Sequence, residues 1–160
     1  MLASEQASKT GEVSGVAQTE LIDSLITTYR ELNNKVRTLP EERLASGGTG
    51  VRDLVRRLRD HELRFSQALK ERITGVEMPD FGSGADAPVL GTESSNDSTA
   101  VLLSQFGTAR ESTLAMLRGL SADEWQGATE GGRSIAASVQ QLTEHDRRHM
   151  DQINSALGGS

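Results

Sequence analysis

The sequence of 160 residues contains three histidines, and their spacing is the feature with the clearest chemical potential. His145 and His149 are four residues apart, about one helical turn, so both imidazoles can lie on one side of a helix. They fall beside Leu142 on an apolar helix face, and His61 falls at the edge of another apolar face. Three neutral imidazoles, with a fourth position open to water or substrate, suit Zn, Ni or Cu rather than Mg or Ca, and we expect Zn or Ni. We therefore predict that His61, His145 and His149 bind a divalent transition metal.

Two carboxylates lie on the same inward-facing arcs. Asp146 directly follows His145, and Glu62 directly follows His61. Either carboxylate can orient an imidazole or act as a base on metal-bound water, although the sequence favours ordinary ion pairs at the surface. The imidazoles also have an alternative role, as histidines hydrogen-bonded to carboxylates or backbone at a helix interface. The pattern identifies no catalytic residue.

These side chains must be positioned by helices, because apolar residues recur at steps of three and four along most of the chain. No stretch shows the alternating pattern of a strand. The sequence predicts four amphipathic helices, over residues 16–39, 51–75, 97–120 and 134–157.

The segments outside these helices complete the predicted organisation. Residues 1–16 are small and polar, and we expect them to form a disordered leader. The irregular segment 75–97 is long enough, at about 3.3 Å per residue, to run the length of a helix bundle. The second and third helices can then lie parallel. We predict an all-α fold, a single four-helix bundle over residues 17–158 with a long crossover between the second and third helices.

Local signals mark several helix ends. Thr49 can cap the second helix, and Asp97 or Ser98 can cap the third. Ser121 and Glu124 have the spacing of a capping box, which would open a short helical turn. That turn contains Trp125, which we expect to pack over the end of the bundle.

The composition excludes several classes of protein. Hydrophobic residues make up 35% of the chain and aromatic residues 3%, so the core must be mainly aliphatic. The 17 basic and 23 acidic residues give a net charge of −6, which argues against nucleic-acid binding. The chain has no cysteine, which excludes thiolate ligands, and no apolar run of about 20 residues, which excludes a membrane span. Its first residues contain no apolar signal-peptide core, so the sequence shows no export signal. We expect a cytoplasmic protein.

Several segments together resemble a known superfamily. The last helix reads His145-Asp146-Arg147-Arg148-His149-Met150-Asp151-Gln152-Ile153 after an opening Ser134-Ile135-Ala136. The second helix opens with Gly50-Val51-Arg52-Asp53-Leu54-Val55, and the turn after the third helix reads Leu120-Ser121-Ala122-Asp123-Glu124-Trp125. With the predicted order of helices, these segments resemble the DinB-like superfamily of four-helix-bundle metalloproteins over residues 17–157.

The resemblance has one departure at the predicted metal site. The position that usually carries the family's ligand histidine in the second helix is Arg57 here, and His61 lies one turn further on. One explanation is that His61 completes the triad, which we expect because it faces inward. The other is that the first ligand is lost and the site is weak or empty. Arg57 could then extend its guanidinium towards the pocket and bind an anion.

The resemblance also suggests a reaction. Members of the superfamily include a mycothiol-dependent isomerase and low-molecular-weight-thiol S-transferases. The resemblance implies a metal ion that binds the thiolate of a small-molecule cosubstrate. That thiol must come from outside the protein, because the chain has no cysteine. We therefore expect a metal-dependent transferase or isomerase acting on a small molecule. Because helix bundles readily pair through a helix face, a homodimer is a further expectation. The alternative is a non-catalytic bundle with a degenerate metal site that binds a ligand or a partner.

Overall fold

A computed structural model of the chain describes residues 2–45, 50–76, 97–127 and 133–158. These residues contain helices and no strand, which confirms the prediction of an all-α fold. The helices are α1 (Leu2–Val36), α2 (Glu41–Ala45), α3 (Val51–Ile73), α4 (Thr99–Arg118), α5 (Ala122–Gln126) and α6 (Ile135–Gly158).

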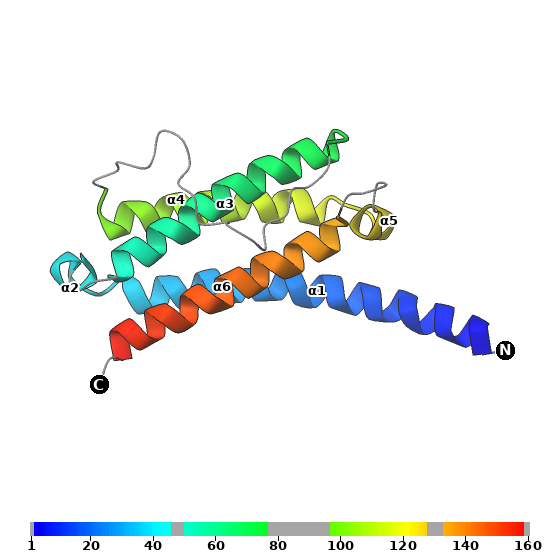
Figure 1. Cartoon of the computed structure of the whole chain (residues 1–160), viewed down its shortest axis with the longest axis horizontal. Helices are drawn as coiled ribbons and strands as arrows, with labels where there is room; N and C mark the ends of the chain where they lie inside the picture. Colours follow the sequence, from blue (N-terminus) through cyan, green and yellow to red (C-terminus); the bar gives the residue numbers. More distant parts are fainter. Residues whose placement is uncertain (1, 46–49, 77–96, 128–132, 159–160) are drawn as a thin grey trace.

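The four long helices α1, α3, α4 and α6 lie alongside one another, and the short helices α2 and α5 lie at opposite ends (Figure 1). Helices α3 and α4 run in the same direction, whereas α1 and α6 run in the opposite one (Figure 1). The predicted long crossover between these two helices requires them to run in the same direction, as they do. Residues 77–96, which make up most of that connection, lie outside the described residues.

Helix α1 begins at Leu2, although the apolar pattern begins only near Val16 and we expected residues 1–16 to be disordered. Its first turns extend beyond the other long helices (Figure 1). This segment contains no proline and several residues with high helix propensity, among them alanine, glutamate, glutamine and lysine. These residues favour helical backbone there, although the segment lacks a periodic apolar face.

Most of the predicted caps are present. The N-cap of α3 is Gly50 and not Thr49, which lies outside the described residues. The Ser98 hydroxyl caps α4, and the capping box is confirmed, with the Ser121 hydroxyl accepting from the Glu124 backbone at 3.1 Å. In return, the Ser121 backbone N–H donates to the Glu124 carboxylate at 2.9 Å, and this hydrogen bond lowers the pKa of Glu124.

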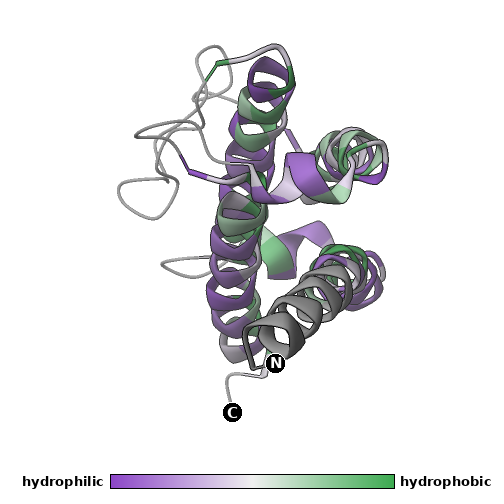
Figure 2. Cartoon of the chain, turned by 90° about the vertical axis from the view of Figure 1, so that its right-hand side faces the viewer, coloured by the Kyte–Doolittle hydropathy of each residue, from purple (hydrophilic) through white to green (hydrophobic). Residues whose placement is uncertain are grey.

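The core is aliphatic with few aromatic residues, as predicted. Viewed end-on, the described helices carry both hydrophilic and hydrophobic residues, as expected for helices with one buried face (Figure 2). The buried apolar residues form two clusters along the bundle, one containing Trp125, Phe65 and Leu142 and the other Phe106, Leu58 and Leu32. Among the described residues, no helix is long and apolar enough to cross a membrane.

Gly107 permits a close approach of α1 to α4. A Cβ atom at this position would lie 2.5 Å from the hydroxyl of Tyr29, whose ring also contacts Phe106 at a centroid distance of 5.9 Å. We expect Gly107→Ala to lower the free energy of unfolding by about 1–3 kcal/mol, because the tyrosine ring must move.

Urea denaturation would measure this effect, with Tyr29→Leu in the Gly107→Ala background as the compensating variant. The smaller side chain leaves room for the new methyl group, so the second substitution should restore part of the lost stability. An unchanged stability of Gly107→Ala alone would contradict the close packing.

Candidate functional site

The structure brings the three histidines together in the interior of the bundle. His61 comes from α3, His145 and His149 come from α6, and their exposed fractions are 1%, 2% and 5%. The rings of His61 and His145 stack with centroids 3.6 Å apart and an interplanar angle of 10°. The rings of His145 and His149 lie 4.1 Å apart at 31°. The prediction that all three imidazoles face inward is confirmed.

A backbone contact sets the tautomer of His149. Its Nδ1 atom lies 3.0 Å from the carbonyl oxygen of His145, one turn earlier in α6. A carbonyl oxygen can only accept a hydrogen bond, so Nδ1 is the nitrogen that carries the proton. In the neutral ring, Nε2 therefore holds the lone pair that is able to bind a cation.

The side chains suit a metal ion by type, burial and proximity. Three imidazoles are a common ligand set for zinc, and here the His145 ring contacts both of the other rings. Their orientation differs from that of a closed metal site, because the lone pairs of parallel stacked rings lie in parallel planes. At least one ring must turn before all three nitrogens can reach one ion at about 2.0–2.1 Å. Accordingly, the described residues contain no group of three or more His, Cys, Asp or Glu arranged to hold a metal.

Arg110 is the central charged residue beside the histidines, and the sequence analysis did not identify it. It lies on α4 and is 1% exposed. Its Nη2 donates to Glu62 Oε1 at 2.7 Å, and its two terminal nitrogens donate to the two oxygens of Asp146 at 2.9 and 3.2 Å. Nη1 also donates to the backbone oxygen of Leu25 on α1 at 3.0 Å. The guanidinium lies over the ring of Phe106, 4.9 Å from its centroid. One side chain thus joins all four long helices.

Glu62 and Asp146 are not surface residues, which corrects the interpretation favoured above. Both are buried, with exposed fractions of 0% and 1%, and their hydrogen bonds described above go to Arg110. The surface interpretation failed because it paired each carboxylate within its own helix, whereas their partner comes from α4. Burial raises the pKa of Asp146, an effect that Arg110 opposes. The two carboxylates raise the pKa of Arg110 against the effect of its burial.

Arg57 does not join the imidazole cluster. Its Nε atom lies 3.1 Å from a carboxylate oxygen of Asp53, and its side chain is 40% exposed. It also lines a shallow pocket between α3 and α6 together with Asp151 and Gln152. The Arg57 guanidinium therefore faces solvent and a neighbouring carboxylate.

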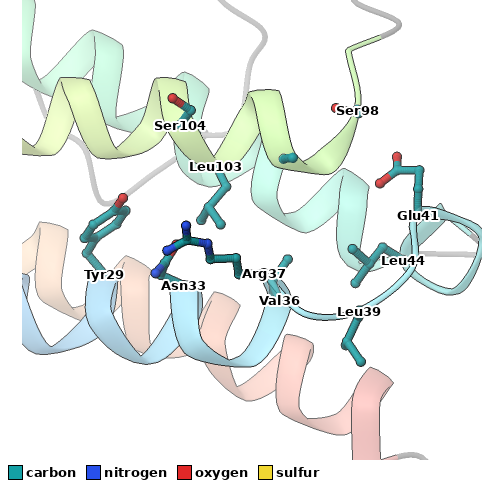
Figure 3. A pocket seen from close by; sticks show the side chains of 11 residues that line it. Tyr29, Asn33, Val36, Arg37, Leu39, Glu41, Leu44, Ser98, Leu103 and Ser104 are labelled. Atoms are coloured by element: carbon teal, nitrogen blue, oxygen red, sulfur yellow. The ribbon is translucent and has the colours of Figure 1, made fainter.

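Another hollow lies near one end of the bundle, between α1, α2 and the start of α4. Its volume is about 430 Å³, and its lining residues include none of the three histidines. Tyr29, Asn33 and Leu103 point into the space between α1 and α4 (Figure 3). The hollow and the histidine cluster are therefore separate features.

The fold and the site together define an all-helical bundle with a buried histidine cluster beside a buried charge network. The chain matches no family model, no curated protein and no solved structure.

Proposed function

We propose that this protein binds a divalent transition metal, Zn or Ni, through His61, His145 and His149. One observation carries the proposal. The three histidines of the chain come from two helices far apart in the sequence and meet in the buried interior with their rings in contact. A neutral imidazole has one nitrogen lone pair that can bind a cation, and in His149 this atom is Nε2 because Nδ1 donates to the backbone.

The proposed activity is a transfer or isomerisation of a small molecule that uses a low-molecular-weight thiol. A metal bound here would supply Lewis acidity that lowers the pKa of a coordinated thiol. The protein's part is to hold the imidazoles close together and to exclude bulk water from them. The cosubstrate must supply the sulfur, because the chain has no cysteine. The DinB-like resemblance supports this reaction class.

A second candidate is a non-catalytic bundle whose metal site has degenerated. The parallel stacking of His61 and His145 favours it, because stacked rings do not converge on one ion. The orientation of Arg57 towards Asp53 favours it as well, since this position usually carries a ligand in the family. In that case the fold would serve to bind a ligand or a second protein chain.

Metal binding separates the two candidates. We expect the purified protein, loaded with zinc or nickel at neutral pH and passed through a desalting column, to retain about one ion per chain by elemental analysis. His149→Ala should abolish retention, because it removes the ligand whose orientation the backbone fixes. His61→Ala should weaken the affinity by about tenfold or more, measured by competition with a chelator.

Glu144→Ala is the matched control, because Glu144 is adjacent to His145 on α6 but exposed to solvent. It should bind metal like the unchanged protein. Retention below about 0.2 ion per chain would refute the metal site and favour the degenerate bundle, because intact three-histidine sites bind well when deprotonated. An unchanged affinity of His61→Ala would show that α3 supplies no ligand.

A further inference from the structure

The Arg110 network and the histidine cluster are linked by adjacency along two helices. Glu62 is the residue after His61 on α3, and Asp146 is the residue after His145 on α6. Adjacent residues of a helix are fixed relative to each other, at about 100° of rotation and 1.5 Å of rise. Holding Glu62 and Asp146 at defined points therefore also determines where the backbone presents His61 and His145.

A single guanidinium holds both carboxylates. Arg110 binds Glu62 at 2.7 Å and both oxygens of Asp146 at 2.9 and 3.2 Å. The guanidinium is planar and rigid, so these bonds restrict both the rotation and the axial position of α3 and α6. The stack of His61 on His145 requires this alignment, because its rings are parallel within 10° at 3.6 Å.

Stability alone does not account for this network. Two carboxyl groups and one guanidinium are buried together, and desolvating charged groups is expensive. Apolar side chains of similar volume often stabilise a core as well as such groups or better. Charged groups with fixed hydrogen-bond geometry, however, specify an alignment that apolar side chains leave free to slide.

We infer that Arg110 is a positioning residue, which sets the alignment of α3 against α6 through Glu62 and Asp146 and thereby assembles the imidazole cluster. Arg110 does not touch the metal or the substrate in this inference. It acts through the two carboxylates on the histidines that precede them. The inference deepens the proposed function, but the stacking of the imidazoles is a property of the metal-free protein and can be tested without a metal.

The main test is the apolar variant Glu62→Leu/Arg110→Met/Asp146→Leu, with Arg110→Lys as a second variant. The readout is the proton NMR spectrum of the imidazole C–H groups in metal-free protein. Three histidines give few such signals, and single histidine substitutions assign them. Stacked rings shift each other's signals upfield of their positions in urea-unfolded protein. Thermal unfolding of each variant measures stability in parallel.

We expect the apolar variant to fold with an unchanged or higher Tm while the upfield imidazole signals of His61 and His145 move towards the unfolded positions. Arg110→Lys should give intermediate shifts, because an ammonium group cannot reproduce the planar fork. Thr113→Val is the matched control, since Thr113 is buried on α4 one turn from Arg110 and its hydroxyl donates to its own helix at Ala109. It should retain the upfield signals.

Imidazole signals that stay upfield in a folded apolar variant would overturn the inference. If the apolar variant does not fold, Arg110→Lys decides: shifted imidazole signals support the inference and unshifted signals overturn it. A second readout uses zinc alone, whose affinity should fall by about 10- to 100-fold in the folded apolar variant. Should the unchanged protein bind no zinc, the proposed function fails, and the NMR result still tests the role of Arg110.

Discussion

Arg110→Met is expected to lower the free energy of unfolding by about 3–5 kcal/mol at neutral pH. The substitution removes the cation but leaves the carboxylates of Glu62 and Asp146 in an interior where both are 1% exposed or less. Each carboxylate then loses its hydrogen bonds and faces a like charge nearby. Urea denaturation followed by circular dichroism would measure the change.

The loss should be smaller in acid. Burial raises the pKa of Asp146 above its ordinary value of 3.8 even beside Arg110, so the folded protein holds this proton more tightly than the unfolded chain. A group whose pKa is raised on folding stabilises the folded protein at pH values below its ordinary pKa. This stabilisation is lost as the pH rises through the folded-state pKa. Without Arg110 the pKa rises further, so Arg110→Met should be more destabilising at pH 7 than at pH 4.

Arg118→Met is the control, because Arg118 is exposed in the last turn of the same helix. Its effect should stay within about 0.5 kcal/mol at both pH values. An equal cost of Arg110→Met at pH 4 and pH 7 would show that the carboxylates do not carry the penalty.

The helices were predictable because the apolar residues of this chain repeat with the period of a helix. Leu142, Val139 and Ile153 are all fully buried, as their spacing on one face of α6 requires. The inward orientation of the histidines follows from the same periodicity. It is a property of the backbone helix, which local sequence determines well.

The burial of Arg110 was not predicted, because a charged residue is normally expected at the surface. The signal was nevertheless present. Arg110 lies four residues after Phe106 and four before Leu114, in the centre of the apolar face of α4. Glu62 and Asp146 lie on the inward arcs of α3 and α6, and buried carboxylates need a cation. Together, the three helix faces therefore indicate a buried cation between two carboxylates.

The orientation of the imidazole rings could not be predicted. Helix periodicity gives the direction of each Cα–Cβ bond, whereas ring stacking depends on side-chain torsions and on the relative position of two helices. The stack of His61 on His145 has an interplanar angle of 10°, which no spacing along one helix encodes. A triad of inward histidines is therefore a prediction about proximity and not about coordination geometry.

Trp125→Ala is expected to cost about 3–5 kcal/mol of unfolding free energy. Trp125 lies on α5, a helix of only five residues, and is 2% exposed. It packs in one cluster with Leu25 of α1, Leu117 of α4 and Ile135 of α6, so its ring joins helices that the short α5 could not hold by itself. Urea denaturation followed by circular dichroism would measure the loss.

Trp125→Phe provides the matched control, because the smaller ring fills much of the same space and should cost clearly less than alanine. The chain contains one tryptophan, so fluorescence of the unchanged protein reports this site alone. Its emission should shift to longer wavelength at the urea concentration at which the helical signal is lost, if α5 unfolds with the bundle. A cost of Trp125→Ala below about 1 kcal/mol, or a fluorescence change well before the loss of helix, would mean that α5 is only loosely attached and that the bundle end is stable without it.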